Sequence, residues 1–121
     1  MTAPAWIAVG LLGGLAAAAR FLIDAEIAAR SRSAFPLGIL LVNLSGSLAL
    51  GVVAGAAVGG EALVIVAGGG IGSFTTFSTW ILDSHRLAEA GEARLAGLNV
   101  AVSLLVGFAA VALGHGLGSL L

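Results

Sequence analysis

A stretch of glycines, hydroxyls and aromatic rings from Gly68 to Ser84 holds the side chains best suited to handle an ion. It reads Gly-Gly-Gly-Ile-Gly-Ser-Phe-Thr-Thr-Phe-Ser-Thr-Trp-Ile-Leu-Asp-Ser inside an otherwise apolar segment. Glycines and hydroxyls at bilayer depth free backbone groups, and such a break is tolerated only where protein or a wet cavity surrounds it. In transporters, broken helices place backbone carbonyls and helix ends around ions. The stretch therefore predicts an ion site within a membrane.

The composition indicates that lipid is the solvent of this chain. Of its 121 residues, 60% are hydrophobic and 9% are charged, whereas about a quarter of a soluble domain is charged. The net charge of −1 offers no basic field to a nucleic acid. Cysteine is absent, which excludes disulfides and thiolate catalysis. The first apolar stretch lacks a basic leader, so a cleaved signal peptide is not expected. We expect one membrane domain over residues 1–121.

The apolar segments predict an all-α fold of four transmembrane helices, because about 20 apolar residues cross a bilayer. The expected spans are approximately 5–23, 36–58, 62–82 and 95–117. The third carries the glycine-rich break, and polar loops are expected over 24–33 and 83–94. Pro36 suits the first turn of the second helix. Glycines four residues apart, such as Gly51 and Gly55, favour close helix packing in lipid. Four short helices enclose little polar space, so we expect an oligomer.

Three strings in the sequence resemble the Fluc (CrcB) family of fluoride channels. The third segment contains Gly72-Ser-Phe-Thr-Thr-Phe-Ser-Thr-Trp80, against a family pattern of roughly Gly-x-x-Thr-Thr-Phe-Ser-Thr-Phe. The second contains Phe35-Pro-Leu-Gly-Ile-Leu-Leu-Val-Asn-Leu-Ser-Gly-Ser47, where the family has Pro-x-Gly-Thr-x-x-Val-Asn-x-x-Gly-Ser. Gly13-Gly14 followed by Arg20-Phe21 provides the third match. The resemblance covers all four segments in order.

This resemblance implies both an architecture and a function. The architecture is an antiparallel dimer of four-helix subunits, with two fluoride pores at the interface and a structural sodium ion at the dimer centre. The function is fluoride-specific, passive export across the plasma membrane, which lowers cytoplasmic fluoride, with no enzyme activity and no transport of the sodium.

The resemblance also assigns residues to the fluoride pathway: Asn43, Ser47, Phe77, Trp80 and Ser103. From the residues alone, Asn43 is equally suited to bonding between helices. Phe77 and Trp80 lie three apart and share a helix face, and aromatic ring edges are positive enough to meet an anion. Packing in the core is the alternative for that pair. Trp80 replaces a family Phe, and Asn99 replaces a frequent Tyr, so the second aromatic contact and the conductance are open.

Gly72 and Thr75 match family positions whose backbone carbonyls bind the central sodium. An unwound helix exposes carbonyls that suit such a cation. Two carbonyls per chain are too few for a site, but a dimer axis would double them. A plain glycine kink is the alternative. Arg20 is expected to end the first span and reach the interface, and Asp83, which matches a family Glu, is otherwise a solvated loop carboxylate.

The distribution of arginines predicts one fixed orientation in the membrane. All five cationic side chains fall in or beside the first and third connections: Arg20, Arg30, Arg32, Arg86 and Arg94. Cytoplasmic loops carry the excess of Arg and Lys, so both termini are predicted outside. A chain biased in this way favours a heterodimer with a related subunit of opposite bias. A homodimer is the alternative, if these arginines are too few to fix orientation.

Two other functions compete with the channel. A small proton-coupled exporter would need an ionisable residue in mid-membrane, and no span has a central Asp, Glu or Lys. A non-conducting assembly subunit explains the packing glycines, but it leaves the Thr-Thr-Phe-Ser-Thr string without a reason. An enzyme is least expected, because no nucleophile and base stand within plausible reach.

Overall fold

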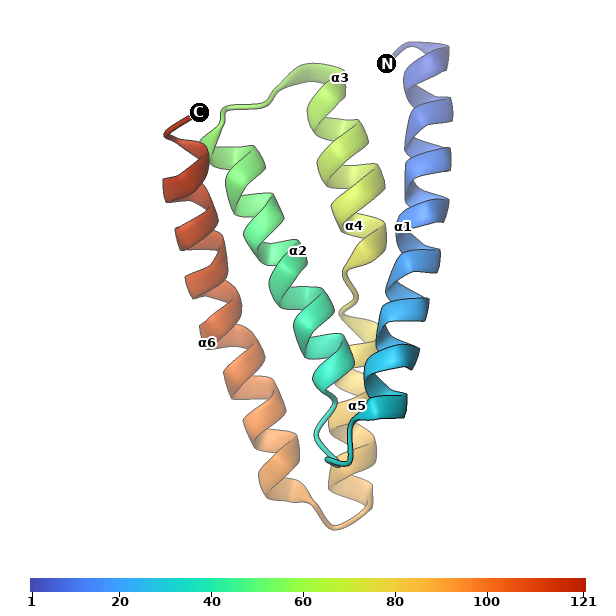
Figure 1. The fold of residues 1–121 in the computed structure, drawn as a ribbon, viewed down its shortest axis with the longest axis vertical. Helices are drawn as coiled ribbons and strands as arrows, with labels where there is room; N and C mark the ends of the chain where they lie inside the picture. The colour runs from blue at the N-terminus through green and yellow to red at the C-terminus, as the bar shows by residue number, and fades with distance from the viewer.

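The computed structural model describes all residues 1–121 and is entirely helical (Figure 1). Four helical runs are long and apolar enough to cross a membrane, which confirms the all-α prediction. The first two are α1 (Ala3–Arg30) and α2 (Leu37–Gly55), and the last is α6 (Ala93–Gly118). The third run, Gly60–Glu89, is composite. It comprises α3 (Gly60–Leu63), the π-helix η1 (Val64–Ile71), α4 (Gly72–Phe74) and α5 (Ser78–Glu89).

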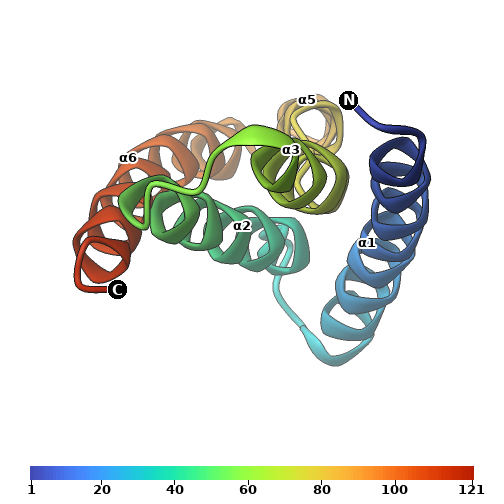
Figure 2. The same cartoon turned by 90° about the horizontal axis from the view of Figure 1, so that it is seen from above.

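The helices pack as neighbours in two pairs, α2 with α6 and α1 with η1 (Figure 2). Glycines bring α2 and α6 into backbone contact. A Cβ atom on Gly51 would collide with the carbonyl of Val111, and one on Gly114 would collide with the carbonyl of Leu48. Such small-residue contacts are typical of helix packing in lipid. Both termini and α3 lie at one end of the molecule, and the α1–α2 and α5–α6 connections lie at the other (Figure 1).

Two of the predicted polar loops are largely helical, so those predictions are wrong. Helix α1 continues through 24–30, where Arg30 and Glu26 form an ion pair at 2.6 Å. Helix α5 continues to Glu89, so Asp83 and His85 lie on a helix. Alanine, glutamate, arginine and leucine are good helix formers in water as in lipid. The change in hydropathy therefore does not coincide with the helix end.

The interruption of the third span lies inside the predicted stretch Gly68 to Ser84, but in its threonine part and after the glycines. Gly68 to Gly72 remain helical, largely in the wide turns of η1. Gly69 lies against α1, where a Cβ would stand 3.1 Å from the Cα of Val9. The chain leaves the helix at Thr75, whose φ of −82° and ψ of 159° are extended, and α5 begins at Ser78. Phe74 ends α4 and is not inside the break.

A smaller difference concerns Pro36. It precedes the first residue of α2 instead of lying in its first turn, and its carbonyl accepts the Leu40 N–H at 3.2 Å. The missing N–H of proline is harmless at either position, because neither has a partner within the helix.

Candidate functional site

The side chain of Asn43 holds the break in the third span. Its Nδ2 donates to the carbonyl of Thr76 at 2.9 Å, and its Oδ1 accepts the Thr76 N–H, also at 2.9 Å. One amide from α2 thus satisfies both backbone groups of an unwound residue. Backbone groups without such partners are costly in lipid, so Asn43 makes the interruption tolerable.

The threonines of the break complete its hydrogen bonding. The Thr76 Oγ1 accepts the N–H of Thr79 at 3.2 Å, in the first turn of α5. The Thr75 Oγ1 donates to the carbonyl of Ile71 at 3.0 Å. Hydroxyl side chains compete in this way with the helical backbone pattern. Thr76 was not among the predicted site residues, although a second threonine directly after the predicted sodium ligand was a usable signal.

The break frees the carbonyl of Ser73, and it also frees two others, those of Gly72 and Thr75. In a continuous helix they would accept the N–H groups of Thr76 and Thr79. Those two N–H groups donate to Asn43 and to Thr76 instead, and neither carbonyl accepts another hydrogen bond within the chain. Gly72 is exposed and Thr75 is half-buried. The two residues predicted to contribute backbone oxygens are therefore among those whose oxygens are available.

A polar groove of about 270 Å³ lies beside the break, between α2 and α6. All five residues predicted for the fluoride pathway line it: Asn43, Ser47, Phe77, Trp80 and Ser103. They come from three separate parts of the chain, and the break brings them together. No acidic or basic side chain lines the groove. Its polar chemistry is limited to amide, hydroxyl and backbone groups, and the rest of its lining is aromatic or aliphatic, with Leu50, Ile71 and Leu104.

Phe77 and Trp80, the two aromatic residues that line the groove, contact each other. The ring centroids of Phe77 and Trp80 are 5.3 Å apart with an interplanar angle of 78°, an edge-to-face arrangement. Phe77 is 71% exposed and Trp80 is 8% exposed. Phe77 therefore presents its ring outward, while Trp80 is wedged against α6. Its Nε1–H donates to the backbone carbonyl of Asn99 at 3.2 Å.

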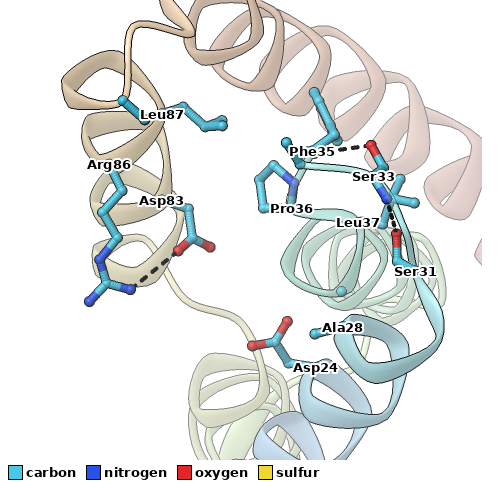
Figure 3. Close-up of a pocket in the computed structure, with 13 residues that line it drawn as sticks. Asp24, Ala28, Ser31, Ser33, Phe35, Pro36, Leu37, Asp83, Arg86 and Leu87 are labelled. Atoms are coloured by element: carbon cyan, nitrogen blue, oxygen red, sulfur yellow. Dashed lines mark hydrogen bonds and ion pairs between the residues drawn. The ribbon is translucent and has the colours of Figure 1, made fainter.

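A second cavity, of about 360 Å³, lies at the end of the molecule that holds the two longer connections (Figure 3). Asp24 on α1 and Asp83 on α5 both line it, and Arg86 stands 4.0 Å from Asp83. It shares no residue with the polar groove. Two carboxylates repel an anion, so this cavity does not suit an anion site. Although larger than the groove, it carries no part of the predicted pathway.

Arg20 lies well inside α1, which continues to Arg30, and not at the end of its helix. Its Nε atom is buried without a hydrogen-bond partner in the chain. Helix α1 continues past Arg20 because polar residues extend it beyond the apolar segment, and the expectation that Arg20 ends the first membrane span and reaches the interface stays a prediction.

Comparison with known proteins places this arrangement in a family. Residues 7–115 match the family model described as CrcB-like protein, Camphor Resistance (CrcB). The chain belongs to the CrcB family. It is a multi-pass membrane protein with four candidate spans and is not an enzyme. The resemblance read from the three strings is confirmed.

Curated relatives align over nearly the whole chain. A protein of Mycolicibacterium paratuberculosis named fluoride-specific ion channel FluC 2 is 41% identical over 119 residues, covering 98% of both chains. Two proteins of Symbiobacterium thermophilum carry related names. Its fluoride-specific ion channel FluC 1 is 42% identical, covering 93% of this chain and 96% of the relative. Its FluC 2 is 44% identical, covering 85% and 88%.

Proposed function

We propose that this chain is a subunit of a fluoride-specific ion channel that exports fluoride passively across the plasma membrane and so lowers cytoplasmic fluoride. The observation that carries the proposal is the groove beside the break that Asn43 stabilises. It has no charged side chain and is lined by Asn43, Ser47, Phe77, Trp80 and Ser103. The family and the names of the relatives support it.

The groove offers fluoride replacements for its hydration water. An amide nitrogen has two N–H donors, and Asn43 uses one of them on Thr76. The second is available to an anion, as is the hydroxyl of Ser47, whereas the Ser103 hydroxyl donates to the Asn99 side chain. Phe77 adds a positive ring edge. These are short-range contacts in a narrow space, so they favour a small anion over chloride. No ionisable group lines the groove, which supports passive movement down a gradient over proton coupling.

The free carbonyls of Gly72 and Thr75 support a structural sodium ion, held between subunits and not transported. Two oxygens from one chain are too few for a sodium ion, but a two-fold or pseudo-two-fold axis would supply two more from the partner. We expect fluoride flux to fall when potassium or a large organic cation replaces sodium on both sides of the membrane. Movement of sodium along with each fluoride would contradict a structural role.

An antiparallel dimer completes the pathway, and we favour a heterodimer. The groove is open, and Phe77 at its rim is exposed, so a second subunit is needed to close it. The charge asymmetry gives the chain one orientation, since both termini lie at the end without arginines (Figure 1). Such a chain needs an oppositely oriented companion. Symbiobacterium thermophilum has relatives named FluC 1 and FluC 2, which fits a paired arrangement.

A cellular experiment tests the proposed function. The chain is expressed, alone and with a related companion subunit, in bacteria that lack their own fluoride exporter. We expect growth in millimolar fluoride to be restored, together with lower cytoplasmic fluoride read by a fluoride electrode after lysis. Normal expression in the membrane without any rescue, alone or with the companion, would contradict the proposal.

A further inference from the structure

The polar groove is backed by a buried hydrogen-bond network between α5 and α6. Asn99 is 1% exposed, and its Nδ2 donates to the Oγ of Ser84 at 2.9 Å. The Ser84 Oγ donates in turn to the carbonyl of Trp80 at 3.0 Å. On the groove side, the Ser103 Oγ donates to the Oδ1 of Asn99 at 3.5 Å. The network therefore connects Trp80 and Ser103, two residues that line the groove, through two that do not.

The same network fixes the indole ring. The Nε1–H of Trp80 donates to the main-chain carbonyl of Asn99, so the ring is tied to α6 by its nitrogen, and the main-chain carbonyl of Trp80 accepts the Ser84 hydroxyl one turn along α5. Indole has one strong donor, and that donor points away from the groove into the helix interface. What remains for an anion is the carbon edge of the ring, which is also what a phenylalanine would offer.

We propose that Ser84 and Asn99 are positioning residues that hold Trp80 with its N–H committed to α6 and its carbon edge at the groove. This inference rests on the proposed function, because it treats Trp80 as part of a fluoride pathway. It also explains how a tryptophan can stand where the family pattern has phenylalanine. The Trp80 Nε1–H donates to the main-chain carbonyl of Asn99, the other position that departs from that pattern, and the Asn99 side chain reaches Trp80 through Ser84.

The hydrogen bonds of Trp80, Ser84 and Asn99 are expected to be energetically coupled. Polar groups buried without partners are costly, so removal of one member leaves another exposed to that cost. Ser84→Ala leaves the Asn99 Nδ2 without its acceptor. Asn99→Leu removes both side-chain bonds and leaves no unpaired polar atom at position 99, and Ser84 can keep its bond to the Trp80 carbonyl. The two variants thus disturb the network from opposite sides, by different physical changes.

The test observes the Trp80 indole directly in the assembled channel. Trp6, which is 62% exposed at the start of α1, is replaced by Phe, so that Trp80 is the only tryptophan in the chain. The chain is labelled with nitrogen-15, and the indole N–H is followed by NMR in nanodiscs, with hydrogen exchange and a sodium fluoride titration. The variants Ser84→Ala, Ser84→Thr and Asn99→Leu are compared. Ser45→Ala is the control, since the Oγ of Ser45 bonds only to Val42 in its own helix.

We expect a protected indole N–H whose chemical shift barely responds to fluoride. Loss of one hydrogen bond from the network should speed its exchange about fivefold in Ser84→Ala and in Asn99→Leu. Ser84→Thr keeps the hydroxyl and should restore protection, and Ser45→Ala should match the parent. Fluoride flux should fall severalfold in the two disturbed variants and recover in Ser84→Thr.

Two results would overturn the assignment. One is a large downfield shift of the indole proton with added fluoride, which would mean that the N–H itself binds the anion. The other is unchanged indole exchange in both Ser84→Ala and Asn99→Leu. The indole measurement needs no flux, so it decides the role of Ser84 and Asn99 even if the channel proposal fails in the flux measurement.

Discussion

Asn43 combines two roles that the sequence alone left as alternatives. Its amide bonds both backbone groups of Thr76, which is a structural role between helices. The same side chain lines the groove, with one N–H left for an anion. A residue that holds the break also places a donor beside it. Asn43 therefore stabilises the break, and the break in turn fixes the position of the N–H that Asn43 has left for an anion.

Replacement of Asn43 by alanine should damage both stability and flux. The Thr76 N–H and C=O would lose their partners, at a cost of about 1–3 kcal/mol for each group left unsatisfied. We expect a lower melting temperature of the purified protein and loss of fluoride efflux. Ser45→Ala on the same helix removes only a bond within α2 and should behave like the parent. Equal melting temperatures for the two variants would argue against the clamp.

The substitution Phe77→Leu distinguishes a contact between the aromatic ring edge and fluoride from a general packing role of this side chain. Phe77 is 71% exposed in one subunit, as is Phe21 on α1, so neither substitution should unfold the chain. An aromatic edge contact of about 1 kcal/mol corresponds to roughly a fivefold change in rate. We expect Phe77→Leu to slow fluoride efflux by at least that factor, while Phe21→Leu leaves it unchanged. A similar loss in both variants would assign Phe77 to general packing.

At the scale of elements, the glycines serve packing and the hydroxyls make the break. Gly69 brings η1 against the backbone of α1, and Gly51 and Gly114 do the same for α2 and α6. The helix ends where Thr75 and Thr76 offer competing oxygens. Glycine lowers the cost of leaving a helix, but in these positions its missing Cβ allows close approach. Sequence reasoning attributed the break to glycines and hydroxyls together, and the structure keeps the glycines helical for this reason.

The contact between α2 and α6 should not tolerate a methyl group. A Cβ on Gly114 would collide with the Leu48 carbonyl and stand 3.0 Å from the Val52 nitrogen. Overpacking of this kind costs about 1–3 kcal/mol. We expect Gly114→Ala to lower the melting temperature, and Gly116→Ala on the same helix, which has no atom within 4 Å of the added carbon, to leave it nearly unchanged. Equal stability of the two variants would contradict the packing described for Gly114.

Hydropathy and short motifs were sufficient to predict the four spans and the set of residues that line the groove. The ends of α1 and α5 could not be predicted, because polar helix formers such as Glu26 and Glu89 continue a helix beyond the apolar segment. The Asn99 network was also missed. Its members recur four residues apart, at Trp80 with Ser84 and at Asn99 with Ser103, but pairing across two helices depends on their register, which the sequence does not specify.

At the scale of the whole molecule, charge and topology agree. The termini and α3 share one end, and the connections with arginines share the other (Figure 1). The positive-inside rule then predicts the termini outside the cell. A tag at the C-terminus should be labelled by an impermeant reagent in intact cells, with little extra labelling after lysis. Equal labelling from both sides would indicate dual insertion and favour a homodimer.

Anion selectivity of the assembled protein tests the central claim most directly. Liposomes loaded with potassium fluoride or potassium chloride, with sodium present on both sides, are prepared with this chain, alone and with a related companion subunit, and efflux is started by valinomycin. An uncharged groove lined by amide, hydroxyl and ring edges should pass fluoride and retain chloride in the preparation that contains the complete dimer. Equal efflux of the two anions, or no fluoride efflux from any correctly assembled preparation, would contradict the account.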